Sequence, residues 1–272
     1  NALNSTAMYT DNARAENMGI IKVGTDSLGM YGVNNAELYN NASIEAGNKA
    51  VGMYGKNTKI ENNNNISSTA DEAIGMYGVS ANVENKGNIS LSNTSTVAMY
   101  GDNSNVTNSN VIDITGEKSI GMYGENSSNL VNNQGIILGN STNISTANTG
   151  IYSNNSTSVN NGNITGGDNS IGVYNSGQFD NFGNIQLGVG AVGVYSDGGT
   201  ATIHTGSKVE AGEVALLVKN GVLTNNTSDI KGNFIGYAGM NGKLINNANL
   251  NVESTGFYAK SGEIENNGII TA

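Results

Sequence analysis

A six-residue motif returns along this chain at nearly constant spacing, and the repeat constrains the fold more than any other feature. Five versions of the motif, typified by AIGMYG, lie at 27–32, 50–55, 73–78, 96–101 and 119–124. Its tyrosine position continues to the end of the chain in steps of 20–23 residues, with one longer step of 29 residues between Tyr123 and Tyr152. The sequence therefore contains about twelve units of ~22 residues, a period typical of solenoid architectures.

Each unit carries two further apolar markers. One is an apolar residue followed two positions later by Asn, as in Val83 and Asn85, and the other follows that Asn by four positions, as in Ile89. Apolar residues alternate with period two, and no stretch keeps a 3.6-residue period, so the markers predict short strands. Three such strands per unit predict an all-β, right-handed parallel β-helix (solenoid) of about twelve coils, with residues 1–272 as a single β-helix segment.

Stacking of equivalent residues explains why the letters repeat. In a parallel β-helix each residue lies over its equivalent one coil away, so the Asn positions predict a ladder of side-chain amide hydrogen bonds. Simple alternation predicts that the motif tyrosines face outward and that its methionines face inward. The expected interior columns are Met30, Met53, Met76, Met99 and Met122, beside Leu28, Val51, Ile74, Val97 and Ile120.

Charge and composition exclude several classes of partner. The net charge is −10 and Arg14 is the only arginine, so the basic surface that nucleic acid or an anionic membrane requires is absent from the sequence. No stretch approaches the ~18 consecutive apolar residues of a membrane-spanning helix, and we expect no direct membrane insertion of this segment. Only 12% of residues are charged while 37% are hydrophobic, which argues against disorder.

Residues capable of acid–base chemistry are few. His204 is the only histidine, and although Asp197 and several serines are close in sequence, we interpret it as a solvated surface residue. Glu61 and Glu84 occupy equivalent outward positions, yet a flat coil face offers no cleft, and Lys86 is placed to neutralise the pair. The sequence predicts no enzyme, no catalytic residue and no cofactor.

Metal binding is not indicated either. The absence of cysteine, together with the single histidine, excludes a His/Cys cluster. The stretch GGDN at 166–169 is similar to a calcium-binding nonapeptide, but it occurs once and lacks tandem copies. We predict no metal site.

Two features are candidates for binding. The outward tyrosines, with Tyr54, Tyr77 and Tyr100 as the strongest candidates, could stack on sugar rings or anchor a protein partner, or could simply stiffen the rod. The long step between Tyr123 and Tyr152 predicts an inserted loop near 139–148, which could bind a partner or be a harmless insertion. Both alternatives stay open for each feature.

The repeat resembles a known family. AIGMYG followed by a V-x-N-x-G-x-I segment, as in AIGMYGVSANVENKGNISL at 73–91, is similar to the passenger repeats of fusobacterial type V (classical) autotransporter adhesins. The resemblance covers nearly the whole chain, is strongest at about 27–200, and weakens where Leu217 replaces tyrosine. It implies a fragment of a longer passenger domain, displayed at the cell surface and anchored to the outer membrane through a translocator barrel absent from this chain.

The resemblance also implies a function and partners. It implies a stalk or binding segment that mediates cell adhesion or interbacterial coaggregation, and it carries no catalytic residues. The expected partners are a host-cell or bacterial surface protein or glycan, and adjoining coils of the same passenger chain. The alternative is a carbohydrate-active parallel β-helix enzyme of the lyase or hydrolase type. Ice binding ranks last, because its Thr-x-Thr pattern occurs only in the isolated stretch TATIHT at 200–205.

Overall fold

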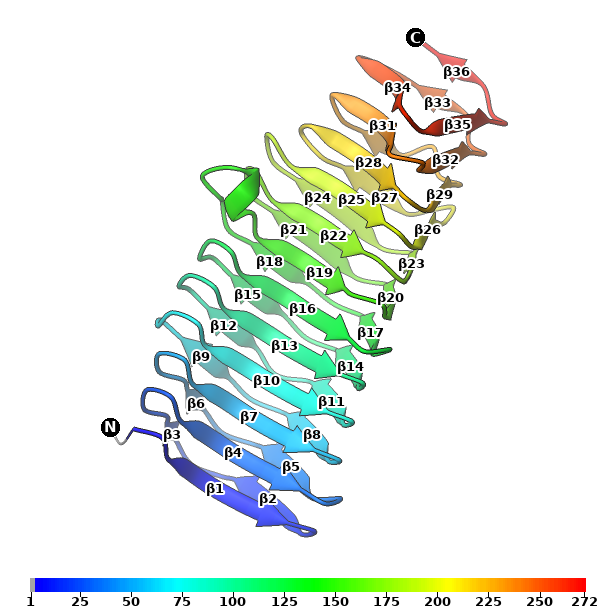
Figure 1. The fold of residues 1–272 in the computed structure, drawn as a ribbon. Coiled ribbons are helices and arrows are strands. Elements are labelled where there is room, and N and C mark those ends of the chain that lie inside the picture. Colours follow the sequence, from blue (N-terminus) through cyan, green and yellow to red (C-terminus); the bar gives the residue numbers. More distant parts are fainter. Residues whose placement is uncertain (1–2) are drawn as a thin grey trace.

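The computed structural model describes residues 3–272, which form one elongated β-solenoid of about twelve coils. Each coil contributes three strands, and each strand pairs in parallel with the equivalent strand one coil away. The coils wind in a right-handed sense from the N-terminal to the C-terminal end of the rod (Figure 1). The predicted all-β parallel β-helix is confirmed, and its coil length follows the spacing of the motif.

The first sheet holds the tyrosine strands in a continuous parallel ladder. Every tyrosine of the motif pairs directly with its equivalent, as Tyr77 does with Tyr54 and Tyr100. The strands are β1 (Thr6–Asp11), β4 (Leu28–Val33), β7 (Val51–Lys56), β10 (Ile74–Val79), β13 (Val97–Asp102), β16 (Ile120–Glu125), β19 (Thr149–Ser153), β22 (Ile171–Asn175), β25 (Val192–Asp197), β28 (Val214–Lys219), β31 (Phe234–Gly239) and β34 (Thr255–Lys260).

The second sheet holds the strands that end on the Asn position and is also continuous. The strands are β2 (Arg14–Asn17), β5 (Glu37–Asn40), β8 (Lys59–Asn62), β11 (Asn82–Asn85), β14 (Asn105–Asn108), β17 (Asn129–Asn132), β20 (Thr157–Asn160), β23 (Gln178–Asn181), β26 (Thr200–Ile203), β29 (Val222–Asn225), β32 (Lys243–Asn246) and β35 (Glu263–Asn266).

The third sheet is shorter-stranded and is interrupted near the C-terminal end of the rod. Its ten-stranded part contains β3 (Ile21–Lys22), β6 (Ile44–Glu45), β9 (Ile66–Ser68), β12 (Ile89–Leu91), β15 (Ile112–Ile114), β18 (Ile136–Leu138), β21 (Asn163–Gly166), β24 (Asn184–Leu187), β27 (Lys208–Glu210) and β30 (Ile230–Lys231). A separate pair, β33 (Leu250–Asn251) and β36 (Ile270–Thr271), continues beyond the interruption.

The interior of the rod contains columns of identical side chains. The five motif methionines are fully buried, as are the apolar residues of the second and third sheets such as Val106 and Ile112. Burial of these columns supplies the hydrophobic stabilisation that a single coil cannot reach alone.

A ladder of buried asparagines runs through the same interior. From Asn17 to Asn181 each side-chain amide donates to the carboxamide oxygen one coil on, at 2.7–2.9 Å. Ile203 interrupts the ladder, which resumes between Asn225, Asn246 and Asn266 at 2.8 Å. The predicted ladder is confirmed. It pairs polar groups that would be expensive to bury alone.

One predicted interior column is wrong. The aliphatic residues at the second position of the motif, Ile74 and its equivalents, are only half-buried and lie on the outer face beside the tyrosines. Strict alternation fails because Gly75 and Met76 both point inward. A Cβ atom built on Gly75 would lie 2.6 Å from the carbonyl oxygen of Ala98 and 3.1 Å from a methyl of Ile89. Because two consecutive residues point inward, the residue before them, Ile74, lies on the outer face instead of the inner face that strict alternation predicts.

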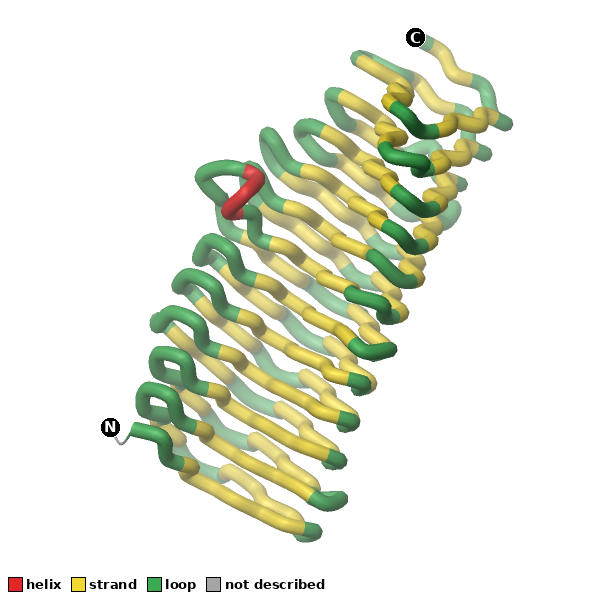
Figure 2. The backbone as a smooth tube through the Cα atoms, viewed as in Figure 1, coloured by secondary structure: helices red, strands yellow, loops and turns green. Residues whose placement is uncertain are grey.

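The segment 139–148 projects from the corner between the third and first sheets. It contains the only helix among the described residues, the 3₁₀ helix η1 (Ile144–Thr146), which stands out from the rod in Figure 2. The Asn143 side chain caps this helix by accepting from the Ser145 amide at 2.9 Å. At the base, the buried Asn148 accepts from the Ser119 amide at 3.0 Å, so the regular coil is preserved beneath the loop.

Candidate functional site

The outer face of the first sheet carries a continuous tyrosine column. Ring centroids of successive tyrosines from Tyr9 to Tyr195 lie 4.3–5.3 Å apart, so each ring contacts the next. The three candidates Tyr54, Tyr77 and Tyr100 occupy consecutive coils at the middle of β7, β10 and β13, and each is half-buried by its neighbours. Their ring contacts are edge-on or tilted, which are favourable arrangements of aromatic pairs.

An aliphatic column runs beside the tyrosines. Its half-buried members are three residues before each tyrosine: Leu28, Val51, Ile74, Val97, Ile120 and Ile171. Together with the tyrosines they form what we call the aromatic–aliphatic band, an apolar strip on the outer face. Sequence reasoning missed half of this band because it placed the aliphatic residues in the core. The glycine between the aliphatic residue and the methionine was the available signal.

Acidic side chains border the band at several coils. The hydroxyl groups of Tyr100 and Tyr123 both donate to the carboxylate of Glu125, the latter at 3.1 Å, and Tyr195 donates to Asp197 at 3.0 Å. The Lys219 ammonium lies 5.1 Å from the Tyr195 ring centroid, within cation–π range. At these coils the band therefore presents apolar ring surface whose hydroxyl groups are already hydrogen-bonded.

Several phenol groups of the band have a raised pKa, which favours their neutral form. Burial, together with the negative charges nearby, raises the pKa of Tyr123 and of Tyr174 to about 12. Burial and the hydrogen-bonded Glu125 carboxylate also raise the pKa of Tyr100 well above its ordinary value. Neutral rings at physiological pH suit stacking on sugars or packing against apolar side chains rather than electrostatic binding.

The paired carboxylates are neutralised as the sequence predicts. Glu61 and Glu84 are direct partners on adjacent coils, and the Lys86 ammonium lies 3.1 Å from the first and 3.2 Å from the second. Lys59 also contacts Glu61 at 3.1 Å. Partial burial acts to raise the pKa of Glu61, but the hydrogen bonds from both lysines outweigh it and the net shift is downward. Glu61 is therefore held in its ionised form, which opposes a role as a proton donor.

His204 is engaged with residues other than Asp197. Its Nε2 atom lies 2.8 Å from the carboxylate of Asp180, and its ring stacks on Phe182 with centroids 3.9 Å apart. Asp180 and Phe182 come from the preceding coil, so this arrangement ties adjacent coils together at the outer surface. Because the carboxylate partner of His204 is Asp180, the arrangement does not form a Ser/His/Asp triad with Asp197.

The GGDN stretch also has a structural explanation. The Asp168 carboxylate accepts from the Val189 amide at 2.8 Å, and its own amide donates to Asn140 at 2.9 Å. Within residues 3–272, no group of three or more His, Cys, Asp or Glu side chains is placed to hold a metal ion.

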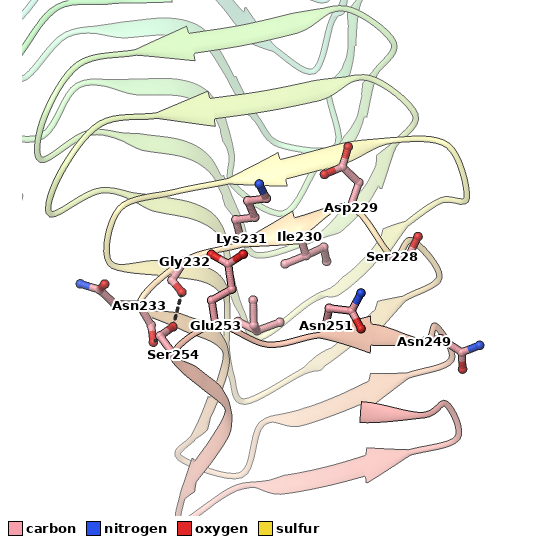
Figure 3. Close-up of a pocket in the computed structure, with 11 residues that line it drawn as sticks. Ser228, Asp229, Ile230, Lys231, Gly232, Asn233, Asn249, Asn251, Glu253 and Ser254 are labelled. Carbon is pink, nitrogen blue, oxygen red and sulfur yellow. Dashed lines mark hydrogen bonds between the residues drawn. The ribbon is translucent and has the colours of Figure 1, made fainter. Parts of the chain in front are cut away.

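A cleft lies where the third sheet is interrupted. No motif in the sequence predicts this cleft. Its volume is about 590 Å³, and it lies between the β30 and β33 segments of successive coils, as Figure 3 shows. The charged side chains at its rim are Asp229, Lys231 and Glu253. One advance signal was the shortening of the repeat to 20 residues between Leu217 and Tyr237.

Comparison of the chain with protein-family models, with curated proteins and with solved structures finds no match. In the described part of the chain, no helix has the length and apolar character needed to span a bilayer.

Proposed function

We propose that this chain is a stalk and binding segment of a bacterial surface autotransporter adhesin, which mediates cell adhesion or interbacterial coaggregation without catalysis. The observation that carries the proposal is the aromatic–aliphatic band, whose tyrosine rings contact one another without a break from Tyr9 to Tyr195. Contiguous apolar strips at a protein surface, even when their side chains are half-buried as here, mark interaction surfaces. The similarity of 73–91 to autotransporter passenger repeats supports the same conclusion.

The proposed partner is a host-cell or bacterial surface protein or glycan. Aromatic side chains supply large contact area and dominate binding energy in protein interfaces, and their faces also stack on sugar rings. A regular rod repeats the same contact at every coil, so many weak contacts add through multivalency. The proposal includes display at the cell surface, anchored to the outer membrane through a translocator barrel outside these 272 residues.

The test is a pull-down of host and bacterial surface proteins and glycans by the chain and by a variant with Tyr54, Tyr77 and Tyr100 changed to Ser. We expect the triple variant to lose most of the capture. A matched control changes the stacked, exposed Asn82, Asn105 and Asn129 of the second sheet to Ser and should capture normally. A chain that captures nothing, or a triple tyrosine variant that captures as much as the control, would contradict the proposal.

The projecting loop is tested in the same assay. Deleting 142–146 removes η1 and shortens the step between Tyr123 and Tyr152 from 29 to 24 residues, close to the regular length, while the buried Ser141 and Asn148 that hold the base remain. A shorter deletion is preferable to removing 139–148, because Asn148 supports the Ser119 backbone of the preceding coil. Loss of capture in this variant alone would assign binding to the loop rather than to the band.

A second candidate function is the carbohydrate-active enzyme, and one observation favours it. The cleft beside β30 brings two carboxylates and a lysine, from Asp229, Glu253 and Lys231, to one concave site. Sugar-cleaving sites use paired carboxylates in this way. Incubation with acidic polysaccharides tests it, because turnover that Glu253→Gln abolishes would favour the enzyme over the adhesin.

A further inference from the structure

The cleft between β30 and β33 interrupts a sheet whose neighbours on both sides are intact. The first sheet continues through β28, β31 and β34, and the second through β29, β32 and β35. Within residues 3–272, β30 pairs with β27 and β33 pairs with β36, but no hydrogen bond joins β30 to β33. Two strand edges therefore face each other across a gap held open by the rest of the rod.

The lower edge of the gap offers the backbone groups of Ile230. Asp229 and Lys231 accept hydrogen bonds from Val209 at 3.0 Å and from Ala211 at 3.0 Å, so their carbonyl groups point to β27. Backbone groups of successive strand residues point in opposite directions within the sheet. The N–H and C=O groups of Ile230 are consequently directed into the gap.

The upper edge offers the backbone groups of Asn251. Leu250 and Val252 donate to Ile269 and Thr271 of the last coil, both at 2.8 Å, so their N–H groups point to β36. The N–H group of Asn251 is therefore directed toward β30. Facing edges with alternating donors and acceptors are what a strand requires on its two sides, and unpaired edges of this kind are sites of strand addition.

The lining of the cleft suits a short strand. The side chains of Ile230 and Ile235 are buried at its floor, while the rim is polar, as Figure 3 shows for Asp229, Lys231 and Glu253. Ser254 closes one end by donating to the Gly232 carbonyl at 2.8 Å.

The other end of the cleft is open. It continues into a second hollow of about 430 Å³ that shares Ser228, Asp229 and Asn249 with the cleft. A peptide longer than the cleft can therefore extend into this second hollow. At the opposite end, Ser254 limits how far a bound peptide can extend.

We propose that this gap binds an extended polypeptide segment, which inserts as an additional strand between β30 and β33. The segment has aliphatic residues on alternate positions, so that they join the interior columns while polar residues between them face the rim. This is the pattern of the third-sheet strands themselves, such as Ile89–Leu91 and Ile112–Ile114. The inference goes beyond the proposed adhesive function, because it uses none of the tyrosines.

The experiment uses the full chain and a fluorescent peptide copying residues 86–94, KGNISLSNT, with binding followed by anisotropy. We expect saturable binding that is lost in a peptide with Ile89→Pro and Leu91→Pro, which cannot donate from those positions. Hydrogen exchange should show fast exchange of the Ile230 and Asn251 amides in the free chain and protection on peptide binding. Binding that leaves both amides unprotected, or protection of both in the free chain, would overturn the proposal, as would absence of binding.

A matched pair of variants isolates the backbone contact. Asn251→Pro removes the N–H directed into the gap while leaving the donors to β36, and Asn251→Ala removes only the side chain. We expect Asn251→Pro to weaken peptide binding about tenfold, and Asn251→Ala to change it by no more than about twofold. Equal affinities for the two variants would contradict strand insertion. Pull-down by the tyrosine band should be unchanged in both, which separates this test from that of the adhesive function.

Discussion

The side-chain amide of Asn85 donates to the carboxamide oxygen of Asn108 at 2.9 Å, and both side chains are fully buried. Asn108 in turn donates to Asn132 at 2.9 Å, so each amide in the interior is at once a donor and an acceptor. The ladder fixes the register of adjacent coils, because a shift by one residue would leave buried amides unpaired.

Asn108→Ala should therefore destabilise the rod strongly. The change leaves the Asn85 amide and the Asn132 oxygen without their ladder partner, and we expect a loss of about 2–3 kcal/mol in the free energy of unfolding. Urea unfolding followed by circular dichroism measures it. Asn105→Ala in the same strand is the control, because Asn105 is exposed and should matter by no more than about 0.5 kcal/mol. Equal unfolding midpoints would show that the ladder is not stabilising.

A second prediction concerns Gly87, where the backbones of adjacent coils approach closely. A Cβ atom built there would lie 1.9 Å from the carbonyl oxygen of Asn64 one coil away. Gly87→Ala should cost about 1–3 kcal/mol, since the coils must separate to admit the methyl group. Gly19 occupies the equivalent position in the first coil and has nothing within 4 Å of its built Cβ atom. Gly19→Ala should leave the thermal midpoint unchanged, and a similar loss in both variants would contradict this explanation.

The coil period, the strand register and the Asn ladder could all be predicted from the sequence, because parallel stacking places identical letters over one another. Tyr77 pairs with Tyr54 and Tyr100 as counting predicts. The position of Ile74 could not be predicted by alternation, because alternation assumes a regular pleat and the inward Gly75 breaks it. In physical terms, a small residue, Gly75 in β10 or the equivalent Ala98 in β13, allows two successive inward positions.

The cleft was beyond sequence reasoning for a different reason. Pairing between β30 and β33 is lost although Ile230 and Leu250 are both buried; Leu250 follows Asn246 by the usual four positions, whereas Ile230 follows Asn225 by five. A pattern of apolar positions reports which side chains face the core, but it does not report the separation of successive backbones. The adhesive function likewise depends on a partner that these residues do not identify.

The Lys86 ammonium, which contacts the carboxylates of both Glu61 and Glu84, leads to a prediction about the pKa of Glu61. Lys86→Met removes one of the two ammonium groups that oppose the effect of burial on Glu61, and it leaves Glu84 unneutralised. We expect the pKa of Glu61 to rise, as measured by the pH dependence of its carboxyl ¹³C chemical shift. Lys56→Met changes an exposed lysine of the first sheet and is the control. An unchanged Glu61 pKa in Lys86→Met would show that Lys59 alone determines it.

A lowered pKa in the folded state also sets the pH range of the effect. The ionised Glu61 stabilises the fold above its ordinary pKa, and this contribution is lost as the pH falls through the lowered value. The difference in stability between the parent chain and Lys86→Met should be largest near neutral pH and vanish in acid. A difference that persists at low pH would indicate lost packing of the lysine stem instead.

Alkaline titration tests the tyrosine band directly. The pKa of Tyr123 and of Tyr174 is raised to about 12 by burial and by neighbouring negative charge, so the folded state favours their neutral form. Their contribution to stability is complete below the ordinary pKa of about 10 and is lost as the pH rises from there to about 12. Absorbance at about 295 nm should show some of the twelve tyrosines ionising only well above pH 10.

Glu125→Gln removes the carboxylate beside Tyr100 and Tyr123 and should lower their pKa values, while Tyr174, which is not hydrogen-bonded to Glu125, serves as an internal control. Ionisation of all tyrosines in one step near pH 10 in the folded chain would contradict a half-buried column of rings in mutual contact.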